Sequence, residues 1–171
     1  LSLDEVSADM RRRAKTANFG IIYGITVFGL ADRLNIERAE AKQLIDGYFK
    51  MFPQVQQYME QAKETARANG YVETFFHRRR YLPDINSGNA TVRAIAERNA
   101  INAPIQGSAA DIIKLAMLEV ERGLIAAGLR SRMLLQVHDE LVFEIRPQAA
   151  AELTPRIVAL MENAMTLSVP L

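Results

Sequence analysis

The sequence predicts an α+β fold, in which a mainly helical first half is followed by a shorter part that combines an antiparallel β-hairpin with packed helices. Helix start and stop signals recur over the first 70 residues, and β-forming runs flank a tight turn near residue 138. A dense turn signal at residues 83–89 separates the two parts. With 171 residues, 49% of them apolar, the chain can build one core or two small lobes.

Three helices are expected in the first half. The first covers residues 7–24, with Ser7 as its amino-terminal cap and Asp9 in its first turn. The others cover residues 37–52, stopped by a proline, and residues 54–69, closed by a glycine. The β-formers and arginines of residues 71–81 then predict a small hairpin or an irregular loop.

The second half begins with two expected helices at residues 90–103 and 108–127, separated by Pro104 and Gly107. Runs of β-formers at residues 132–137 and 141–145 predict an antiparallel hairpin. A last helix is expected to run to about residue 165, with Pro155 marking a late start or a kink.

Composition excludes some classes of function. The chain has no cysteine, so neither disulfides nor catalytic thiols are available. No apolar run approaches the roughly 20 residues that span a bilayer, and the amino terminus has no signal-peptide pattern, so no membrane partner is expected. The formal charge of +1 hides basic clusters at residues 11–15 and 78–80. These clusters suit a phosphate-bearing partner or an ordinary solvated surface.

Four residues of the first expected helix recur every fourth position and form a slowly winding stripe about 18 Å long. Arg11 and Lys15 stand at the amino-terminal end, and Phe19 and Tyr23 follow. Cations can hold phosphate oxygens while rings pack against sugar and base, so the stripe suits a nucleoside triphosphate. The alternative is a surface Arg/Lys stripe with both aromatic residues in a core.

Two further groups suggest nucleic-acid chemistry. Asp139 and Glu140 stand side by side at the expected hairpin turn, where carboxylate oxygens can hold Mg²⁺ for phosphoryl transfer or simply face solvent. Amide and guanidinium groups at near-helical spacing can reach minor-groove acceptors. These residues are Arg93, Arg98, Asn102 and Gln106. The two amides also fit as caps of helix ends.

Three strings resemble motifs of the DNA polymerase family that includes bacterial DNA polymerase I, family A. RRRAKTANFGIIYG at residues 11–24 resembles motif B of the fingers helix, and QVHDELV at residues 136–142 resembles motif C. ERNAINAPIQGSAAD at residues 97–111 resembles the palm segment that touches primer and template. The resemblance covers about residues 3–171 and implies a fingers subdomain at 1–88 and the carboxy-terminal part of a palm at 89–171.

The resemblance also implies roles for individual residues. Arg11 and Lys15 would contact the incoming triphosphate, with Lys15 also catalytic, while Phe19 packs near the sugar and Tyr23 sits at the nascent base pair. Asp139 would be a catalytic metal ligand and Glu140 a less essential catalytic neighbour at the same metal. The implied DNA-binding residues are Arg93, Arg98, Asn102, Gln106 and, against the primer end, His138.

The same resemblance implies two Mg²⁺ ions in the complete enzyme, with primer-template DNA and deoxynucleoside triphosphates as partners, in the bacterial cytoplasm at the nucleoid. Motif A, the thumb and any exonuclease part are absent from these 171 residues. The remaining palm, the thumb and a possible exonuclease are therefore expected in the same polypeptide, and the isolated chain is expected to be inactive. His77 stands where the family pattern has glycine, which puts DNA contacts by residues 78–80 in question.

Two other functions fit parts of the pattern. A non-catalytic DNA-binding helical module would use only the basic clusters. A metal-dependent phosphodiesterase would use Asp139 and Glu140 and would hydrolyse its substrate without nucleotides. Neither gives the four-residue stripe a purpose.

Overall fold

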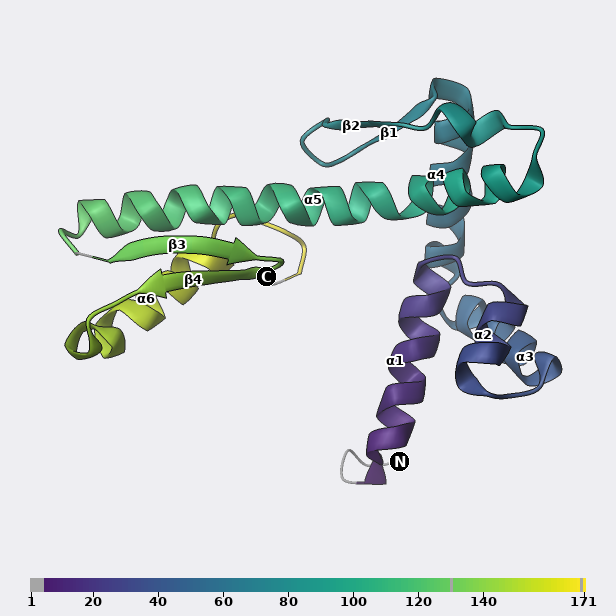
Figure 1. Ribbon diagram of the computed structural model, residues 1–171, viewed down its shortest axis with the longest axis horizontal. Coiled ribbons are helices and arrows are strands. Elements are labelled where there is room, and N and C mark those ends of the chain that lie inside the picture. The colour runs from purple at the N-terminus through teal and green to yellow at the C-terminus, as the bar shows by residue number, and fades with distance from the viewer. Residues whose placement is uncertain (1–4, 130, 170) are drawn as a thin grey trace. The chain divides into compact units, whose positions relative to one another are not determined.

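The computed structural model describes residues 5–129, 131–169 and 171 (Figure 1). The chain forms two compact units, Leu1–Pro104 and Ile105–Leu171. The first residues of the expected fingers subdomain and of the resemblance lie outside the described residues. The α+β class predicted from the sequence is confirmed, because small antiparallel sheets accompany a mainly helical chain.

The first unit begins with helix α1, Ala8–Ile22, as predicted. The Ser7 hydroxyl accepts a hydrogen bond from the Met10 amide at 3.1 Å, which caps the helix. Helix α2, Val27–Leu34, was not expected from the sequence; Thr26 caps its start and Asn35, in the left-handed conformation, ends it. Helices α1, α2 and α3 contact one another (Figure 1).

Helices α3, Arg38–Met51, and α4, Pro53–Asn69, agree with the predicted ones. Gly70 ends α4 with φ 76°, a conformation that glycine adopts without strain. Buried side chains of α2 and α3 form one core, which consists of Leu30, Ala31, Leu34 and Ala41.

The predicted small hairpin pairs β1, Tyr71–Glu73, with β2, Arg79–Tyr81, in antiparallel register. A 3₁₀ turn, η2, Pro83–Asn86, leads into α5. Together α4, β1, η2 and the start of α5 enclose a second core, made of Ala66, Val72, Leu82, Ile85, Ala96 and Ala100. The subdomain limit expected at residues 88–89 falls in the loop before α5 and stays a prediction.

The expected break at Pro104 and Gly107 is wrong. A single helix, α5, runs over Ala90–Ala126 with Pro104 in its interior. A proline inside a helix removes one hydrogen bond and crowds the carbonyl four residues earlier, which commonly kinks or ends the helix. Helix α5 nevertheless continues through residue 104.

The second unit contains β3, Arg132–Val137, paired with β4, Glu140–Glu144, which confirms the predicted hairpin. A bulge between Met133 and Leu135 shifts the register. Helix α6, Ala150–Glu162, follows the 3₁₀ turn η3, Pro147–Ala149, so it starts well before Pro155 and ends before residue 165. The third core joins α5 and α6 through Val120, Leu124, Leu153 and Ile157, with Met133 and Phe143 of the hairpin packed against it.

Candidate functional site

The basic cluster on α1 divides into paired and unpaired cations. Arg12 binds Asp9 at 2.6 Å, and Arg13 lies 3.6 Å from Glu40 of α3. Arg11 and Lys15 are exposed and form no ion pair with any residue that the structure describes. The two cations predicted to hold phosphate are therefore the two that remain available for an anion.

Arg11 and Lys15 lie one helical turn apart at the border of the same hollow, between α1 and α3. This α1–α3 hollow has a volume of about 760 Å³ and is also lined by Leu44, Tyr48 and Phe52. The amino-terminal half of α1 adds the positive end of the helix dipole. An anion held there would meet two cations on one side and an apolar wall on the other.

Phe19 and Tyr23 border a different hollow. Their side chains are 55% and 41% exposed, and with Thr16, Ile25 and Arg33 they line a space of about 370 Å³. Each step of four residues turns about 40° around the helix, so Tyr23 lies about 120° from Arg11. The structure thus brings the cations together and the aromatic rings together, on neighbouring faces of one helix. The alternative that both rings lie in a core is wrong.

The turn that follows α1 lies close to α5. Gly24 has φ 72°, and a Cβ placed on it would lie 3.4 Å from Cγ of Arg98 and 3.9 Å from Cδ1 of Ile101. A side chain at position 24 would therefore be strained in its backbone and would be in van der Waals contact with Arg98. Tyr23, at the aromatic end of the stripe, therefore lies next in sequence to a residue that approaches Arg98, which is predicted to contact DNA.

Arg93 is engaged within the fold. Its Nη1 donates to the carbonyl of Ser87 at 2.7 Å, and its Nε lies 4.0 Å from Glu97, which also binds Arg67 at 2.7 Å. These contacts hold the loop before α5 against the helix. Any DNA contact by Arg93 would compete with them, and that role stays a prediction.

The other predicted DNA-binding residues of α5 differ in exposure. Arg98 is exposed, whereas Oδ1 of Asn102 is buried and accepts no hydrogen bond within the described part of the chain. Gln106 is exposed and belongs to the second unit. Neither amide caps a helix end, because both lie inside α5.

The carboxylates predicted to bind metal stand at the tip of the β3–β4 hairpin. Val137 pairs with Glu140, so His138 and Asp139 form a two-residue turn. His138 has φ 57°, and its carbonyl accepts a hydrogen bond from Gln136 Nε2 at 2.7 Å. The turn is thus held from within its own strand, and all three side chains from 138 to 140 are exposed.

The donor chemistry of this turn fits a hard cation, since Mg²⁺ prefers carboxylate oxygen. Across the described residues, no group of three or more His, Cys, Asp or Glu side chains could hold a metal. Asp139 and Glu140 can therefore supply part of a ligand set but not a complete one.

One face of the hairpin is apolar and exposed. Strand pairing places Leu135 opposite Val142 and Val137 opposite Glu140, so these four side chains share a face. Leu135, Val137 and Val142 are 50%, 42% and 39% exposed. The opposite face, with Met133 and Phe143, packs on the third core.

The basic cluster of the β1–β2 hairpin is partly structural. Arg79 Nε donates to Glu73 at 2.8 Å, and its guanidinium lies 4.4 Å from the centre of the Tyr71 ring. The hydrogen bond from Arg79 holds the pKa of Glu73 below its usual value, with a smaller contribution from His77. His77 has φ 60°, the left-handed conformation that glycine would adopt without strain. Arg79 is thus engaged within the hairpin.

Sequence reasoning missed two residues that organise this part of the chain. The Thr74 hydroxyl accepts hydrogen bonds from the amides of Phe76 and Arg78, which a threonine before a turn could have signalled. The Tyr58 hydroxyl donates to the carbonyl of Ile101 at 2.9 Å, across 43 positions of sequence. No local pattern indicates the second contact.

Known proteins resemble the whole chain. DNA polymerase I of Streptococcus pneumoniae serotype 4 is 53% identical over 168 residues, 98% of this chain and 19% of that protein. DNA polymerase I of Rhizobium leguminosarum is 56% identical over 164 residues, 95% of this chain and 16% of that protein. The chain spans about a fifth of the length of these curated relatives.

A solved structure agrees with the fold. The POL domain of Pol1 from M. smegmatis, in complex with DNA primer-template and dNTP, superposes with a TM-score of 0.94 at 48% identity, covering 100% of this chain and 30% of that one. None of the described helices combines the length and apolar character that a membrane-spanning segment needs. The sequence profile of DNA polymerase family A matches residues 1–171, and the chain therefore belongs to DNA polymerase family A.

Proposed function

We propose that the chain is the fingers and carboxy-terminal palm part of a DNA-directed DNA polymerase, which adds deoxynucleotides to a primer 3′ end. The observation that carries this proposal is the pair of exposed, unpaired cations, Arg11 and Lys15, at the amino-terminal half of α1. Neighbouring cations are neutralised by Asp9 and Glu40. The family and the solved relative with primer-template DNA and dNTP support the same function.

In this proposal Arg11 and Lys15 hold the triphosphate of the incoming nucleotide. Charged hydrogen bonds to its oxygens orient the α-phosphorus and offset the charge that builds up on the leaving pyrophosphate, which is the catalytic part of Lys15. Phe19 and Tyr23, on the following turns, pack against sugar and base. The primer 3′ hydroxyl loses its proton to solvent as its oxygen forms a bond to the α-phosphorus. The bond between that phosphorus and the pyrophosphate oxygen breaks, and pyrophosphate leaves.

The remaining predicted residues act on DNA and metal. Arg98, Asn102 and Gln106 reach the minor groove, where acceptors common to all correct pairs report pair shape. Arg93 also binds DNA in this proposal, in exchange for its contacts to Ser87 and Glu97, and His138 lies against the primer end. Asp139, with Glu140 as its neighbour, would hold Mg²⁺. Two such ions would supply activation of the primer hydroxyl and stabilisation of the leaving oxygens.

The 171-residue chain alone should not polymerise, because Asp139 and Glu140 provide only part of the cage that two metal ions require. Further palm carboxylates, the thumb and any exonuclease part would come from a longer polypeptide. The exposed apolar face of the β3–β4 hairpin suits packing against that further palm. We place the complete enzyme in the bacterial cytoplasm at the nucleoid.

The test is nucleotide incorporation by a polymerase-length protein that contains this chain. Arg11→Ala and Lys15→Ala should each reduce kcat/KM for nucleotide by about 10- to 150-fold, equivalent to about 1.5 to 3 kcal/mol for a charged hydrogen bond. Primer-template binding should stay unchanged. Arg12→Ala is the matched control, because this neighbouring cation already binds Asp9. If all three variants changed kcat/KM for nucleotide by the same factor, Arg11 and Lys15 would not be nucleotide-binding residues.

A further inference from the structure

Helix α5 passes through Pro104 where the sequence predicts a break, so this turn needs support from elsewhere. Position 104 has no amide hydrogen to donate to the carbonyl of Ala100, and the proline ring crowds that carbonyl. The turn is also shielded from solvent, because Ala100 is fully buried and Ile101 is 4% exposed. Water is therefore a poor substitute for the missing donor.

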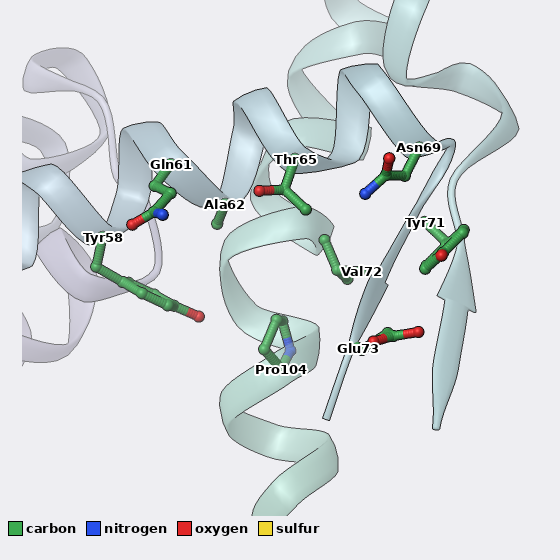
Figure 2. A pocket seen from close by; sticks show the side chains of 9 residues that line it. All are labelled: Tyr58, Gln61, Ala62, Thr65, Asn69, Tyr71, Val72, Glu73 and Pro104. Atoms are coloured by element: carbon green, nitrogen blue, oxygen red, sulfur yellow. The ribbon is translucent and has the colours of Figure 1, made fainter. Parts of the chain in front are cut away.

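Tyr58 of α4 supplies a hydrogen bond from outside the helix to this turn, at the carbonyl of Ile101, which is next to the Ala100 carbonyl that Pro104 leaves without an amide donor. Its hydroxyl donates to the carbonyl of Ile101 at 2.9 Å, from a side chain that is itself half-buried. Burial raises the pKa of Tyr58, so the hydroxyl keeps its proton and remains a donor. Figure 2 shows Tyr58 and Pro104 at the same hollow, with the tyrosine reaching from α4 toward α5.

The supported turn carries groups of the proposed site. Arg98 lies one turn before Ile101 and Asn102 directly after it. On the same turn, Arg98 and Ile101 lie against Gly24, which follows Tyr23 at the end of α1. A shift of the Ile101 carbonyl would therefore move both predicted minor-groove residues relative to the aromatic end of the stripe.

We propose that Tyr58 is a positioning residue for primer extension, which holds the proline turn of α5 through the Ile101 carbonyl. It touches neither nucleotide nor DNA in this proposal. Its effect on activity rests on the proposed function, whereas its support of the proline turn does not.

Tyr58→Phe in the polymerase-length protein removes only the hydroxyl. Extension from a matched primer end should fall about 3- to 10-fold, the range expected for one hydrogen bond, mainly in kcat. Extension from a mismatched end should fall less, because a mismatched pair does not present the minor-groove acceptors in the positions that these residues contact. The KM for nucleotide should stay within about twofold of its original value. Tyr81→Phe is the matched control, since Tyr81 is exposed on β2. Equal losses from matched and mismatched ends would overturn the proposal.

A double-mutant cycle tests the mechanism. Pro104→Ala restores the amide hydrogen that can donate to the Ala100 carbonyl and removes the ring that crowds it, so the turn should depend less on the hydrogen bond at Ile101. The loss caused by Tyr58→Phe should then shrink to less than about twofold in that background. Hydrogen exchange of residues 99–106 gives a readout independent of activity: Tyr58→Phe should speed it about 3- to 10-fold, and less when Pro104 is replaced. Unchanged exchange, or the same Tyr58→Phe loss in both backgrounds, would overturn the proposal. The proposed function has a separate test: unchanged kcat/KM for nucleotide in Arg11→Ala and Lys15→Ala would contradict it.

Discussion

Helix α1 and the β3–β4 hairpin carry two different shares of the proposed chemistry. The helix holds its groups on one element: Arg11 and Lys15 lie together at one hollow, and Phe19 and Tyr23 lie on the following turns. The hairpin holds two neighbouring carboxylates at an exposed turn, and among the described residues they are not part of any group of three His, Cys, Asp or Glu side chains that could hold a metal. A single helix can supply the cations that bind a phosphate, whereas a site for two metal ions needs carboxylates from several elements.

The largest effect should come from the hairpin. Asp139→Ala in the polymerase-length protein should lower the incorporation rate at least about 10³-fold, because the metal's charge stabilisation amounts to several kcal/mol. Glu140→Gln should cost less, and Glu144→Gln, farther along β4, should cost little. Rapid-quench incorporation assays measure all three. If Asp139→Ala lowered the incorporation rate no more than Glu144→Gln does, the hairpin would not be part of the catalytic site.

A second test concerns the residue that α1 touches on α5. Arg98→Ala should reduce extension from a matched primer about 10-fold, the range for a charged hydrogen bond, and should reduce it less from a mismatched end. Arg122→Ala, an exposed arginine of the same helix paired with Glu119, serves as the control. Primer-extension rates from the two ends decide the outcome. Equal losses would make Arg98 a general support.

A smaller effect is expected at the aromatic part of the stripe. The family resemblance places Phe19 beside the sugar 3′ position, so the hydroxyl of Phe19→Tyr could replace part of the contact that a dideoxynucleotide lacks. Discrimination against dideoxynucleotides should fall at least about 3-fold, as for one neutral hydrogen bond. Phe76→Tyr on the β1–β2 hairpin should leave it unchanged. The ratio of the two incorporation efficiencies measures the effect, and an unaltered ratio in Phe19→Tyr would contradict the placement.

The smallest effect is local and concerns the β1–β2 hairpin. Arg79 lowers the pKa of Glu73 in the folded state below its ordinary 4.5, so folding favours the charged carboxylate. This contribution is complete above the ordinary pKa and is lost as the pH falls through the lower folded value. Amide exchange of residues 71–81, measured by NMR and corrected for its intrinsic pH dependence, should lose protection on acidification in that window. Glu73→Gln should remove this dependence, and its persistence would assign it to another group.

Much of the fold follows from local signals in the sequence. Ser7 and Gly70 mark helix ends through a side-chain cap and a left-handed glycine, and both act as predicted. The hairpin around Asp139 follows from β-forming runs on both sides of a short turn. These features depend on neighbouring residues, so a single sequence is enough to find them.

The errors have a different origin. Helix α5 continues past Pro104, and its Ile101 carbonyl accepts a hydrogen bond from Tyr58, 43 positions away in the sequence. Helical periodicity cannot reveal a contact between residues so far apart in the sequence. Helix α2 is eight residues long, too short for its pattern to stand out although Thr26 and Asn35 mark its ends. Arg11 and Lys15 stand out because the cations between them form ion pairs, Arg12 with Asp9 and Arg13 with Glu40. Glu40 belongs to another helix, so local sequence does not reveal its ion pair.

Primer extension with Mg²⁺ tests the central contrast most directly, comparing the 171-residue chain alone with a polymerase-length protein that contains it. The account predicts extension only by the longer protein. Both proteins contain Arg11 and Lys15, the proposed triphosphate-binding residues, but in the chain alone Asp139 and Glu140 form only part of a metal site. Extension by the chain alone, abolished by Asp139→Ala, would contradict it.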